Sequence, residues 1–487
     1  MSSDGVAEFP GSLPDGLLIG GEWVPSSGGA RINVENPANQ EVVATIASAT
    51  VDDVEAALVS AESGWKSWRE VDAWTRSAVL REVSRIVRAW APSMARVLTM
   101  EEGKPLAEAK AEVLAAADQF DWYADEARRL YGRTVEGHSR TNRISVYKSA
   151  VGPVAAFVAW NFPVLLAARK LAPALAAGCS VVLKLPEEAP LTGLLLAEAC
   201  RIAGVTPDAI SVLTGDPVMI SDRLLSSQVI RKMSLTGSVG VGQELLTKAA
   251  ARITPASMEL GGHAPVLVFP DADLEGAASA CVRAKYRNAG QVCAAPSRFY
   301  VHKSVGEEFI EAFVSRAKEL KLGDGFDPGT DVGPLINERR QNAAHRLVED
   351  ARSKGAVLAL GGGRGGHDRG YFYEPSVLVD ADPSMAVMSE EPFAPVAPIM
   401  RFGRLEDALA EANRTPYGLA SFVYTSDLRT AVLASEGLEA GMVGVNTMLI
   451  ATAEAPFGGV KMSGYGREGG PEGVDEYTVA KYVNISL

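Results

Sequence analysis

The feature that most constrains the fold is the alternation of short apolar runs with helix-length segments from residue 150 onward. Val154-Ala-Ala-Phe-Val-Ala-Trp160 is apolar on both faces, as strands of a helix-covered parallel sheet usually are. A first block predicts strands over 151–159, 180–184, 209–213, 230–235 and 264–268, with helices over 164–177, 191–203, 217–225 and 240–250. A second alternating block covers about 273–450. The sequence therefore predicts two doubly wound, three-layer α/β units.

The chain before residue 150 has a different pattern. Segments 51–63, 73–99 and 105–130 show helical apolar spacing, and Thr50 with Asp53 forms a capping pair at the start of the first. We therefore expect the first third of the chain to be mostly helical. No long Pro/Ser linker separates the parts, so the units are expected to pack closely.

Charge and hydropathy exclude several classes of partner. The chain has 47 basic and 60 acidic residues, a formal charge of −13, and no Lys/Arg run typical of a nucleic-acid site. The uncharged window 149–168 contains Pro153 and Pro163, which fits a buried strand and turn better than a membrane span. The N-terminus is acidic and has no following apolar run, so export is not expected. We expect neither nucleic acid nor membrane as a partner.

The metal-binding and disulfide-forming residues are scattered. Four cysteines (Cys179, Cys200, Cys281 and Cys293) lie far apart or in apolar contexts, and five histidines form no His-x-x-His or Glu-x-x-His pattern. We therefore predict no metal site and free thiols in a reducing, cytoplasmic environment.

Two short motifs suggest covalent chemistry. Glu259 lies in Met-Glu-Leu-Gly-Gly and Cys293 ends Gly-Gln-Val-Cys, and the glycines in both allow close approach of backbone to a ligand. An ionised cysteine is a strong nucleophile, and a carboxylate can deprotonate either the thiol or an attacking water. Taken alone, such residues are far more often a buried structural thiol and a solvated carboxylate, so the rest of the chain has to decide.

Two glycine clusters compete for a phosphate-binding role. Gly361-Gly-Gly-Arg-Gly-Gly366 opens no helix and is interpreted as a surface loop. Thr236-Gly-Ser-Val-Gly-Val-Gly242 follows a strand and leads into a helix, where amide groups can hold a pyrophosphate. Lys184 and Glu187 end another strand at the edge where α/β sheets bind nucleotides, although an ordinary charged loop is the simpler explanation of that pair.

Taken in order, the motifs resemble those of the aldehyde dehydrogenase superfamily over essentially the whole chain. The residues that carry the resemblance are Trp160-Asn-Phe-Pro163, Lys184-x-x-Glu187, Thr236-Gly-Ser238, Glu259-Leu-Gly-Gly262, Gly290-Gln-x-Cys293, Glu391-x-Phe393 and Pro456-Phe-Gly-Gly459. The resemblance implies an NAD(P)-dependent enzyme that oxidises an aldehyde to a carboxylic acid through a cysteine thiohemiacetal and thioester.

The resemblance also implies a division into three parts. A dinucleotide-binding domain would comprise 1–129 and 150–258, a catalytic domain 259–460, and a small β arm 130–149 and 474–487. Because an exposed strand edge needs a covering partner, the arm leads us to expect a homodimer or homotetramer.

The implied catalytic residues follow from matching positions. Cys293 attacks the aldehyde, and the Asn161 side-chain amide with the Cys293 backbone N–H holds the oxyanion. Glu259 deprotonates the water that hydrolyses the thioester, and Lys170 with Glu468 occupies the positions of the family's proton-relay pair.

The implied cofactor residues surround the dinucleotide. They are Trp160, Lys184, Glu187, Thr236, Gly237, Ser238, Gly261, Glu391 and Phe393. Leu185-Pro186 and Ala394 depart from the common family pattern, so the geometry of those two loops does not carry over directly. A carboxylate at Glu187 favours NAD over NADP, because it accepts from the ribose 2′-OH and repels a 2′-phosphate, although the superfamily accommodates both.

Two arginines point to the substrate. Arg169 and Arg287 match positions that grip the distal carboxylate in succinate-semialdehyde dehydrogenases, and a guanidinium makes two charge-assisted hydrogen bonds to such a group. The alternative is that either arginine pairs with a structural glutamate. The sequence therefore predicts a carboxylated semialdehyde such as succinate semialdehyde. A broad-range or aromatic aldehyde dehydrogenase and a catalytically silent protein with this fold remain the alternatives, and Glu259 argues against transfer to coenzyme A.

Overall fold

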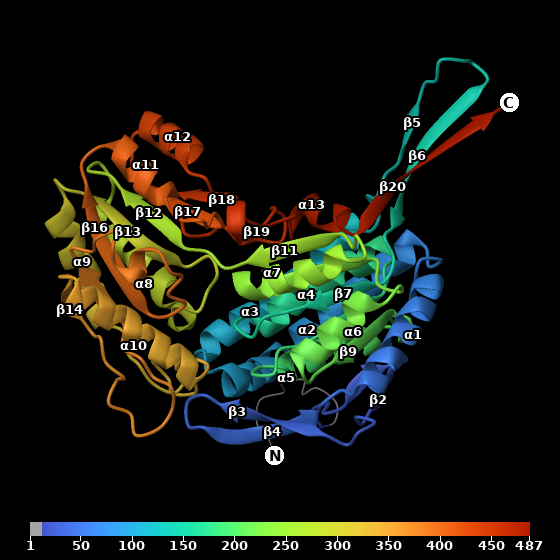
Figure 1. Ribbon diagram of the computed structural model, residues 1–487, viewed down its shortest axis with the longest axis horizontal. Coiled ribbons are helices and arrows are strands. Elements are labelled where there is room, and N and C mark those ends of the chain that lie inside the picture. Colours follow the sequence, from blue (N-terminus) through green and yellow to red (C-terminus); the bar gives the residue numbers. More distant parts are fainter. Residues whose placement is uncertain (1–11) are drawn as a thin grey trace.

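Two twisted sheets with helices packed around them lie side by side in the computed structural model of the protein, and a β arm projects from one of them (Figure 1). The structure describes residues 12–487. The acidic start of the chain, on which the expectation of no export rests, lies outside these residues. Two doubly wound α/β units are therefore present, as the alternating pattern predicts.

The first sheet has eight strands in the order β19-β11-β10-β7-β8-β9-β1-β2. Its parallel centre is formed by β7 (Val154–Phe157), β8 (Val181–Lys184), β9 (Ile210–Leu213), β10 (Lys232–Gly237) and β11 (Ala256–Leu260). Antiparallel strands extend both edges: β1 (Leu17–Ile19), β2 (Glu22–Val24) and β19 (Gly464–Tyr465).

Helices cover both faces of this sheet. Along β7, Val154 and Ala156 pack into the core that holds α2 (Ala73–Glu102), α3 (Leu106–Glu126), α4 (Pro163–Ala177) and α5 (Leu191–Ile202). The alternate residues Ala155 and Phe157 pack on the opposite face against α1 (Val51–Trp68), α6 (Pro217–Ser226) and α7 (Val239–Ala250). This period of two produces three layers, because successive side chains of a strand point to opposite faces.

The second sheet has seven strands in the order β14-β15-β16-β13-β12-β17-β18. Six run parallel: β12 (Ala264–Val268), β13 (Pro296–His302), β15 (Ser376–Val379), β16 (Val396–Phe402), β17 (Ala420–Tyr424) and β18 (Met442–Val445). The edge strand β14 (Val357–Leu360) is antiparallel. The surrounding helices are α8 (Leu274–Tyr286), α9 (Gly306–Lys318), α10 (Glu338–Ser353), α11 (Leu405–Asn413) and α12 (Leu428–Gly437).

The strand expected over 264–268 belongs to this second sheet, not to the first block in which the sequence pattern placed it. β12 pairs with β13 and β17 at the centre of the second sheet, whereas β11 closes the parallel part of the first. Gly261 and Gly262 separate the two strands. An apolar run predicts a buried strand but does not specify which sheet the strand joins.

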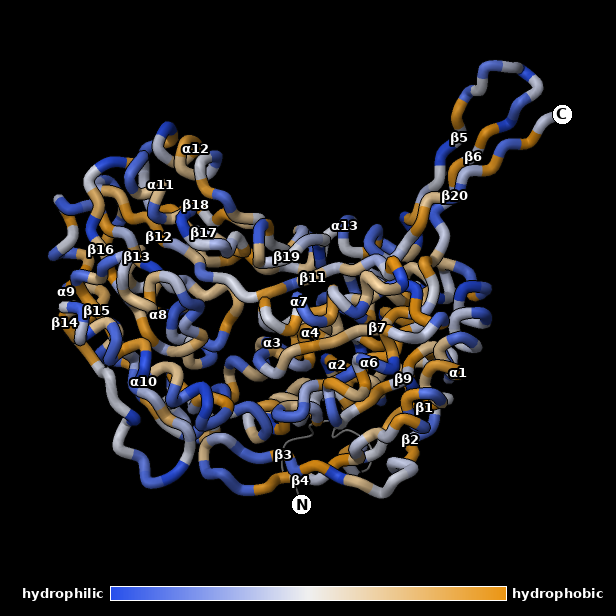
Figure 2. The backbone as a smooth tube through the Cα atoms, viewed as in Figure 1, coloured by the Kyte–Doolittle hydropathy of each residue, from blue (hydrophilic) through white to orange (hydrophobic). Residues whose placement is uncertain are grey.

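The segment before α1 also differs from the expectation of a mostly helical first third. Residues 12–50 contain β1, β2 and the hairpin of β3 (Arg31–Asn36) with β4 (Glu41–Ala47). In β3 the apolar residues Ile32 and Val34 alternate with polar ones, a signal of a half-buried strand. Figure 2 shows the apolar residues concentrated along the strands and inner helix faces of both lobes.

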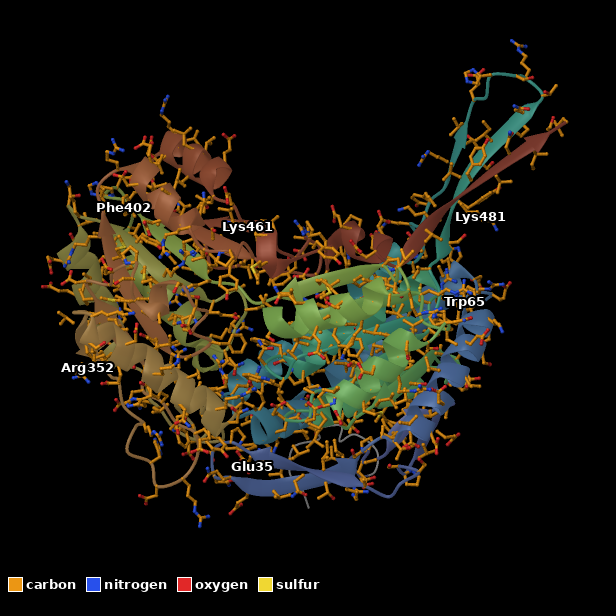
Figure 3. All side chains as sticks on the ribbon, viewed as in Figure 1. Glu35, Trp65, Arg352, Phe402, Lys461 and Lys481 are labelled. Carbon is orange, nitrogen blue, oxygen red and sulfur yellow. The ribbon has the colours of Figure 1, made fainter. Side chains whose placement is uncertain are left out.

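The arm is a three-stranded antiparallel sheet of β5 (Arg133–Val135), β6 (Asn142–Ala150) and β20 (Thr478–Ser486). It is joined to the first lobe through α13 (Gly470–Asp475). Lys481 marks it in Figure 3, well away from both lobes. Its large apolar side chains are exposed, with Tyr147 54% and Tyr482 62% accessible. Apolar groups exposed on a strand surface favour burial against another chain.

Within residues 12–487, none of the helices combines the length and the apolar character needed to cross a bilayer.

The capping pair predicted at the start of α1 is present. The Thr50 hydroxyl accepts from the Asp53 N–H, and the Asp53 carboxylate accepts from the Thr50 N–H at 2.8 Å. We expect Thr50→Ala to lower the free energy of unfolding by about 1 kcal/mol, because an N-terminal amide of the helix loses its partner. Urea unfolding followed by tryptophan fluorescence measures the change. Thr206→Ala is the matched control, since Thr206 precedes the short 3₁₀ helix Pro207–Ala209 without a side-chain cap; an equal loss in both variants contradicts the capping argument.

Candidate active site

The predicted site residues meet where the carboxyl edge of the first sheet faces the amino edge of the second. From the first sheet, Asn161 follows β7 and Glu259 lies near the end of β11. From the second, Cys293 precedes β13, and Glu391 with Phe393 precedes β16. The carboxyl edge of an α/β sheet is its usual ligand-binding edge. The sequence pattern did not show that the second lobe would contribute its opposite edge.

Two glycines let the lobes approach. A Cβ on Gly261 would lie 2.3 Å from a Glu391 carboxylate oxygen, and one on Gly262 would lie 2.6 Å from the Cys293 carbonyl oxygen. Only glycine fits such contacts. The Gly262 N–H also donates to Glu391 at 3.1 Å. The motif that contains Glu259 is therefore held directly against the loops of Cys293 and Glu391.

Cys293 differs from the other cysteines. Cys179, Cys200 and Cys281 are fully buried, whereas Cys293 is partly accessible, and all four are free thiols. Burial raises the pKa of the Cys293 thiol to about 12, and the carboxylates of Glu391 and Glu259 add to the shift. In this state the sulfur is a neutral thiol at neutral pH, and it requires a nearby positive charge or a base to become a nucleophile.

Glu259 is a buried carboxyl group available for proton transfer. Neither of its oxygens has a hydrogen-bond partner among the described residues. Burial raises the pKa of Glu259 well above its usual value, and the charge of Glu468 adds to the shift while Lys170 and Arg169 oppose it. A buried carboxyl group with a raised pKa is a candidate for the proton transfer that a general base performs.

Lys170 and Glu468 form a buried ion pair beside Glu259. Lys170 lies on α4, and Glu468 is held in place by backbone hydrogen bonds in both directions with Phe457. The neighbouring Arg169 approaches Glu468 at 3.9 Å and stacks on the Phe457 ring at 4.3 Å. The structure therefore brings together the two residues predicted as a proton relay.

Asn161 is fixed by contacts at both ends. Its side-chain Nδ2 donates to the carbonyl of Gln291 at 3.0 Å, two residues before Cys293. Its own carbonyl accepts from Lys104 Nζ at 2.8 Å and from Asn288 Nδ2 at 2.9 Å. An amide has two N–H groups. Asn161 therefore retains one for another acceptor near the sulfur.

Several residues of the site were not predicted from the sequence. They are Lys104, Lys285, Asn288, Gln291 and Arg340, all held close to predicted residues. Asn288 and Ala289 adopt left-handed φ values of 49° and 52°, which non-glycine residues rarely do, just before the loop of Cys293. Their proximity to Gly290 and Cys293 in the sequence was the only available signal.

Groups that can bind a phosphate-containing ligand lie at the end of β10 and the start of α7. Ser238 caps α7 by accepting from the Val241 N–H at 3.4 Å, and the helix N-terminus is open to solvent at Val241. The buried Thr236 hydroxyl has no partner within residues 12–487, and Gly237 follows it. Lys184 and Glu187 pair with one another at the end of β8. These groups are available to bind phosphate and ribose oxygens. The Gly361–Gly366 cluster is a partly exposed loop far from these elements in the chain.

Trp160 and Phe393 link the groups at β10 and α7 to the reaction centre. Their rings meet edge to face, with centroids 5.5 Å apart and planes at 89°. Phe393 has a left-handed φ of 44°, and Arg340 holds that backbone by donating to the carbonyls of Pro392 and Phe393. Burial raises the pKa of the adjacent Glu391 to about 7, although Arg340 and Lys285 oppose the shift. Burial also lowers the pKa of Lys285 to about 7.

A pocket of about 600 Å³ opens between α2, α3, α4 and the loop 449–454. Arg169 and Thr452 belong to its wall. Of the two predicted carboxylate-binding arginines, only Arg169 lines this pocket among the described residues. Arg287 is exposed and its guanidinium lies over the Phe162 ring at 5.0 Å. The structure thus does not bring the two guanidinium groups together in one wall.

Comparison with known proteins agrees with this geometry. The aldehyde dehydrogenase family model matches residues 23–483. A succinate-semialdehyde dehydrogenase [NADP(+)] of Escherichia coli (strain K12) is 41% identical over 471 residues, covering 96% of this chain and 97% of the relative. A glutarate-semialdehyde dehydrogenase of Pseudomonas putida is 41% identical over 469 residues, covering 96% and 97%. A crystal structure of succinate-semialdehyde dehydrogenase from Burkholderia pseudomallei superposes with a TM-score of 0.96 at 41% identity, covering 98% of both chains. Because the family model covers nearly the whole chain and these relatives are 41% identical over 96% of it, the chain belongs to the aldehyde dehydrogenase family.

Proposed function

We propose that the protein oxidises a carboxylated semialdehyde, such as succinate semialdehyde, to the dicarboxylic acid with NAD or NADP. The observation that carries the chemistry is Glu259: a buried carboxyl group with both oxygens unpartnered in the described chain, beside the Lys170–Glu468 pair. Leaving such a group unpaired is costly. The cost is explained if a water or substrate group occupies that position during turnover.

In the first step the Cys293 thiol releases its proton to solvent, and the resulting thiolate attacks the aldehyde carbon. The carbonyl oxygen becomes an oxyanion, and the free N–H of Asn161 with the backbone N–H of Cys293 stabilises it. When bound, the oxidised nicotinamide accepts the hydride, and its positive charge favours the thiolate. Loss of the hydride leaves a thioester on Cys293.

The second step is hydrolysis of the thioester. Glu259 removes a proton from water, whose oxygen attacks the acyl carbon, and the thiolate of Cys293 leaves. The carboxylic acid departs and the proton on Glu259 must be returned to solvent. The buried Lys170–Glu468 pair, which borders Glu259, is the route we propose for that proton.

The cofactor-binding groups suit either dinucleotide. Ser238, Thr236 and the N-terminus of α7 offer hydroxyls and amides to a pyrophosphate, and the Trp160–Phe393 pair borders the nicotinamide end. Glu187 accepts from a free 2′-OH, whereas Lys184 beside it offers a cation to a 2′-phosphate. The E. coli relative is named for NADP. We therefore propose that the enzyme accepts both, with Glu187 favouring NAD.

The substrate proposal rests on Arg169. Its guanidinium is buried in the wall of the 600 Å³ pocket, where it can bind a distal carboxylate. Thr452 in the same wall offers a hydroxyl. The named substrates of the two relatives, succinate and glutarate semialdehydes, both carry such a carboxylate. We propose that Arg287 contributes from the outer side of Phe162 when substrate is bound.

We further propose that the exposed apolar side chains of the arm, among them Tyr482 and Ile485, are covered by a second copy of the chain in a homodimer or homotetramer. The four free thiols support a reducing cytoplasmic location.

Replacing Glu259 by glutamine tests the hydrolytic step. We expect Glu259→Gln to release a burst of about one reduced dinucleotide per active site, followed by a steady rate about 10²- to 10³-fold below that of the unmodified enzyme. In the unmodified enzyme the hydrolytic rate should rise with pH through the raised pKa of Glu259, because the carboxylate is the active form, and Glu259→Gln should lose this rise. Stopped-flow and steady-state absorbance at the reduced nicotinamide band measure both the burst and the steady rate.

The control variant is Glu472→Gln, at an exposed position of α13, which should retain the normal steady rate. A normal steady rate in Glu259→Gln would exclude Glu259 as the base.

Replacing Arg169 tests the substrate class. We expect Arg169→Gln to lower kcat/KM for succinate semialdehyde about 10- to 100-fold, the value of a charged hydrogen bond, mainly through KM. For butanal, which has the same number of carbon atoms and no carboxylate, kcat/KM should change by less than about threefold, because butanal has no group for the guanidinium to bind. Arg287→Gln, measured separately, shows whether the outer arginine takes part. If kcat/KM falls equally for both aldehydes, Arg169 stabilises Glu468 and the fold and does not bind the substrate carboxylate.

A further inference from the structure

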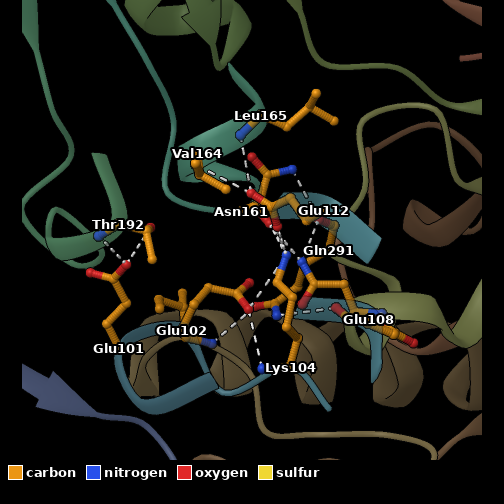
Figure 4. A network of polar contacts seen from close by, with 12 residues as sticks. Glu101, Glu102, Lys104, Glu108, Glu112, Asn161, Val164, Leu165, Thr192 and Gln291 are labelled. Carbon is orange, nitrogen blue, oxygen red and sulfur yellow. Dashed lines mark hydrogen bonds and ion pairs between the residues drawn. The ribbon is translucent and has the colours of Figure 1, made fainter. Parts of the chain in front are cut away.

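A buried lysine lies behind the reaction centre, outside the machinery described so far. Lys104 follows the C-terminal Gly103 of α2, and its side chain has 0% exposure. Its Nζ donates to Glu112 Oε2 at 2.6 Å and to the carbonyl oxygen of Asn161 at 2.8 Å. The ammonium also lies 3.9 Å from the centre of the Phe162 ring. Lys104 therefore contacts two consecutive residues of the turn that carries the proposed oxyanion donor (Figure 4).

The partner of Lys104 is fixed independently of it. Glu112 on α3 accepts from the backbone N–H groups of Val164 and Leu165, at 3.2 and 3.3 Å, at the start of α4. The other nearby carboxyl group is Glu102, 3.7 Å away, and burial raises the pKa of Glu102 to about 8. Glu112 thus joins α3, the start of α4 and Lys104 into one rigid unit, and Lys104 connects that unit to Asn161.

The opposite side of Asn161 is held by the loop of the nucleophile. Asn288 donates to the Asn161 carbonyl at 2.9 Å, and its backbone N–H donates to Glu108 on α3 at 2.8 Å. Gln291 accepts the Asn161 side chain through its carbonyl, and its own side-chain oxygen accepts from the Ile336 N–H at 2.9 Å. Because the side-chain amide is planar, holding one of its N–H groups on Gln291 also restricts the direction of the second. The contacts to the Asn161 backbone carbonyl hold the Cα from which that side chain extends.

We infer that Lys104 is a positioning residue for the oxyanion: its ammonium locks the Asn161 backbone so that the free side-chain N–H points at the developing charge. This inference rests on the proposed role of Asn161. Stability alone does not explain Lys104, since burying an ammonium ion is costly and an apolar side chain of similar volume often serves a fold equally well. Preorganised donors matter most in the transition state, and small misplacements there are expensive in rate.

A double-mutant cycle tests the inference. With saturating cofactor and butanal as substrate, so that the outcome does not depend on the semialdehyde proposal, we expect Lys104→Met to lower kcat about 10- to 100-fold with KM changed by less than about threefold. Asn161→Ala should lower kcat about 10²- to 10³-fold, as loss of an oxyanion donor does. In Lys104→Met/Asn161→Ala, the loss should equal that of Asn161→Ala alone, because Lys104 acts only through that amide.

A second readout separates positioning from general disorder. Alkylation of Cys293 by iodoacetamide forms no oxyanion, so its rate at fixed pH should be the same in Lys104→Met as in the unmodified enzyme. Lys110→Met, at an exposed position of α3, is the matched control and should leave kcat unchanged. Asn288→Gly removes the other donor to the Asn161 carbonyl while allowing the left-handed φ, and it provides the same test if Lys104→Met does not fold.

Three outcomes overturn the inference. If the loss of kcat in the double variant equals the product of the losses in the two single variants, Lys104 is a structural residue. If the rate of Cys293 alkylation in Lys104→Met falls together with kcat, the whole site has collapsed. An unchanged kcat in Lys104→Met, or in Asn288→Gly where that variant is used instead, would remove the positioning role altogether. If Asn161→Ala alone retains full kcat, the proposed role of Asn161 fails instead, and that failure is seen independently of Lys104.

Discussion

The rest of the structure depends on the close approach of two backbones at Gly261 and Gly262. β11 ends the parallel part of the first sheet and β12 begins at the centre of the second, so these glycines form one crossing of the chain between the lobes; the segment from β18 to β19 forms another. Both Cβ positions are occupied by other groups, the Glu391 carboxylate and the Cys293 carbonyl. A side chain at Gly262 would collide with the Cys293 backbone, and one at Gly261 would displace the buried Glu391 carboxylate. The absence of side chains at this link therefore helps to bring Glu259, Cys293 and Glu391, the three acidic groups of the proposed site, close together.

The electrostatics of the junction fit the chemistry proposed for it. Cys293, Glu259 and Glu391 all have raised pKa values, in each case mainly because burial disfavours the charged form. Three acidic groups held in one dry region form a site that gains from a positive charge entering it. An oxidised nicotinamide is such a charge, and its arrival would favour the thiolate over the thiol. In the mechanism we propose, cofactor binding would therefore promote formation of the Cys293 thiolate.

The sequence correctly predicted secondary-structure elements that follow from local patterns, but it did not predict features that depend on long-range contacts. Apolar runs and their spacing correctly predicted β7, β8 and the helices from α1 to α7, because these elements follow from periodicity. β12 was assigned to the wrong block, because the partners of a strand are not encoded in the strand itself. The hairpin of β3 and β4 was missed, since its alternation spans few residues. Lys170 and Glu468, nearly 300 residues apart, were paired only through family resemblance, and the structure places them in contact.

Lys104 shows why the reverse inference, from structure to role, is needed. Nothing in the neighbourhood of Gly103-Lys104-Pro105 marks a functional residue, and the contact partners Asn161 and Glu112 are distant or lie in another helix. Asn161 itself belongs to the first lobe, yet its side chain binds the Gln291 carbonyl in the segment leading to Cys293. Asn161, the oxyanion donor that we propose, thus contacts both lobes. Any change that alters their relative position must also move that donor relative to the sulfur, so the rate of acylation should be the property most sensitive to the packing of the two lobes.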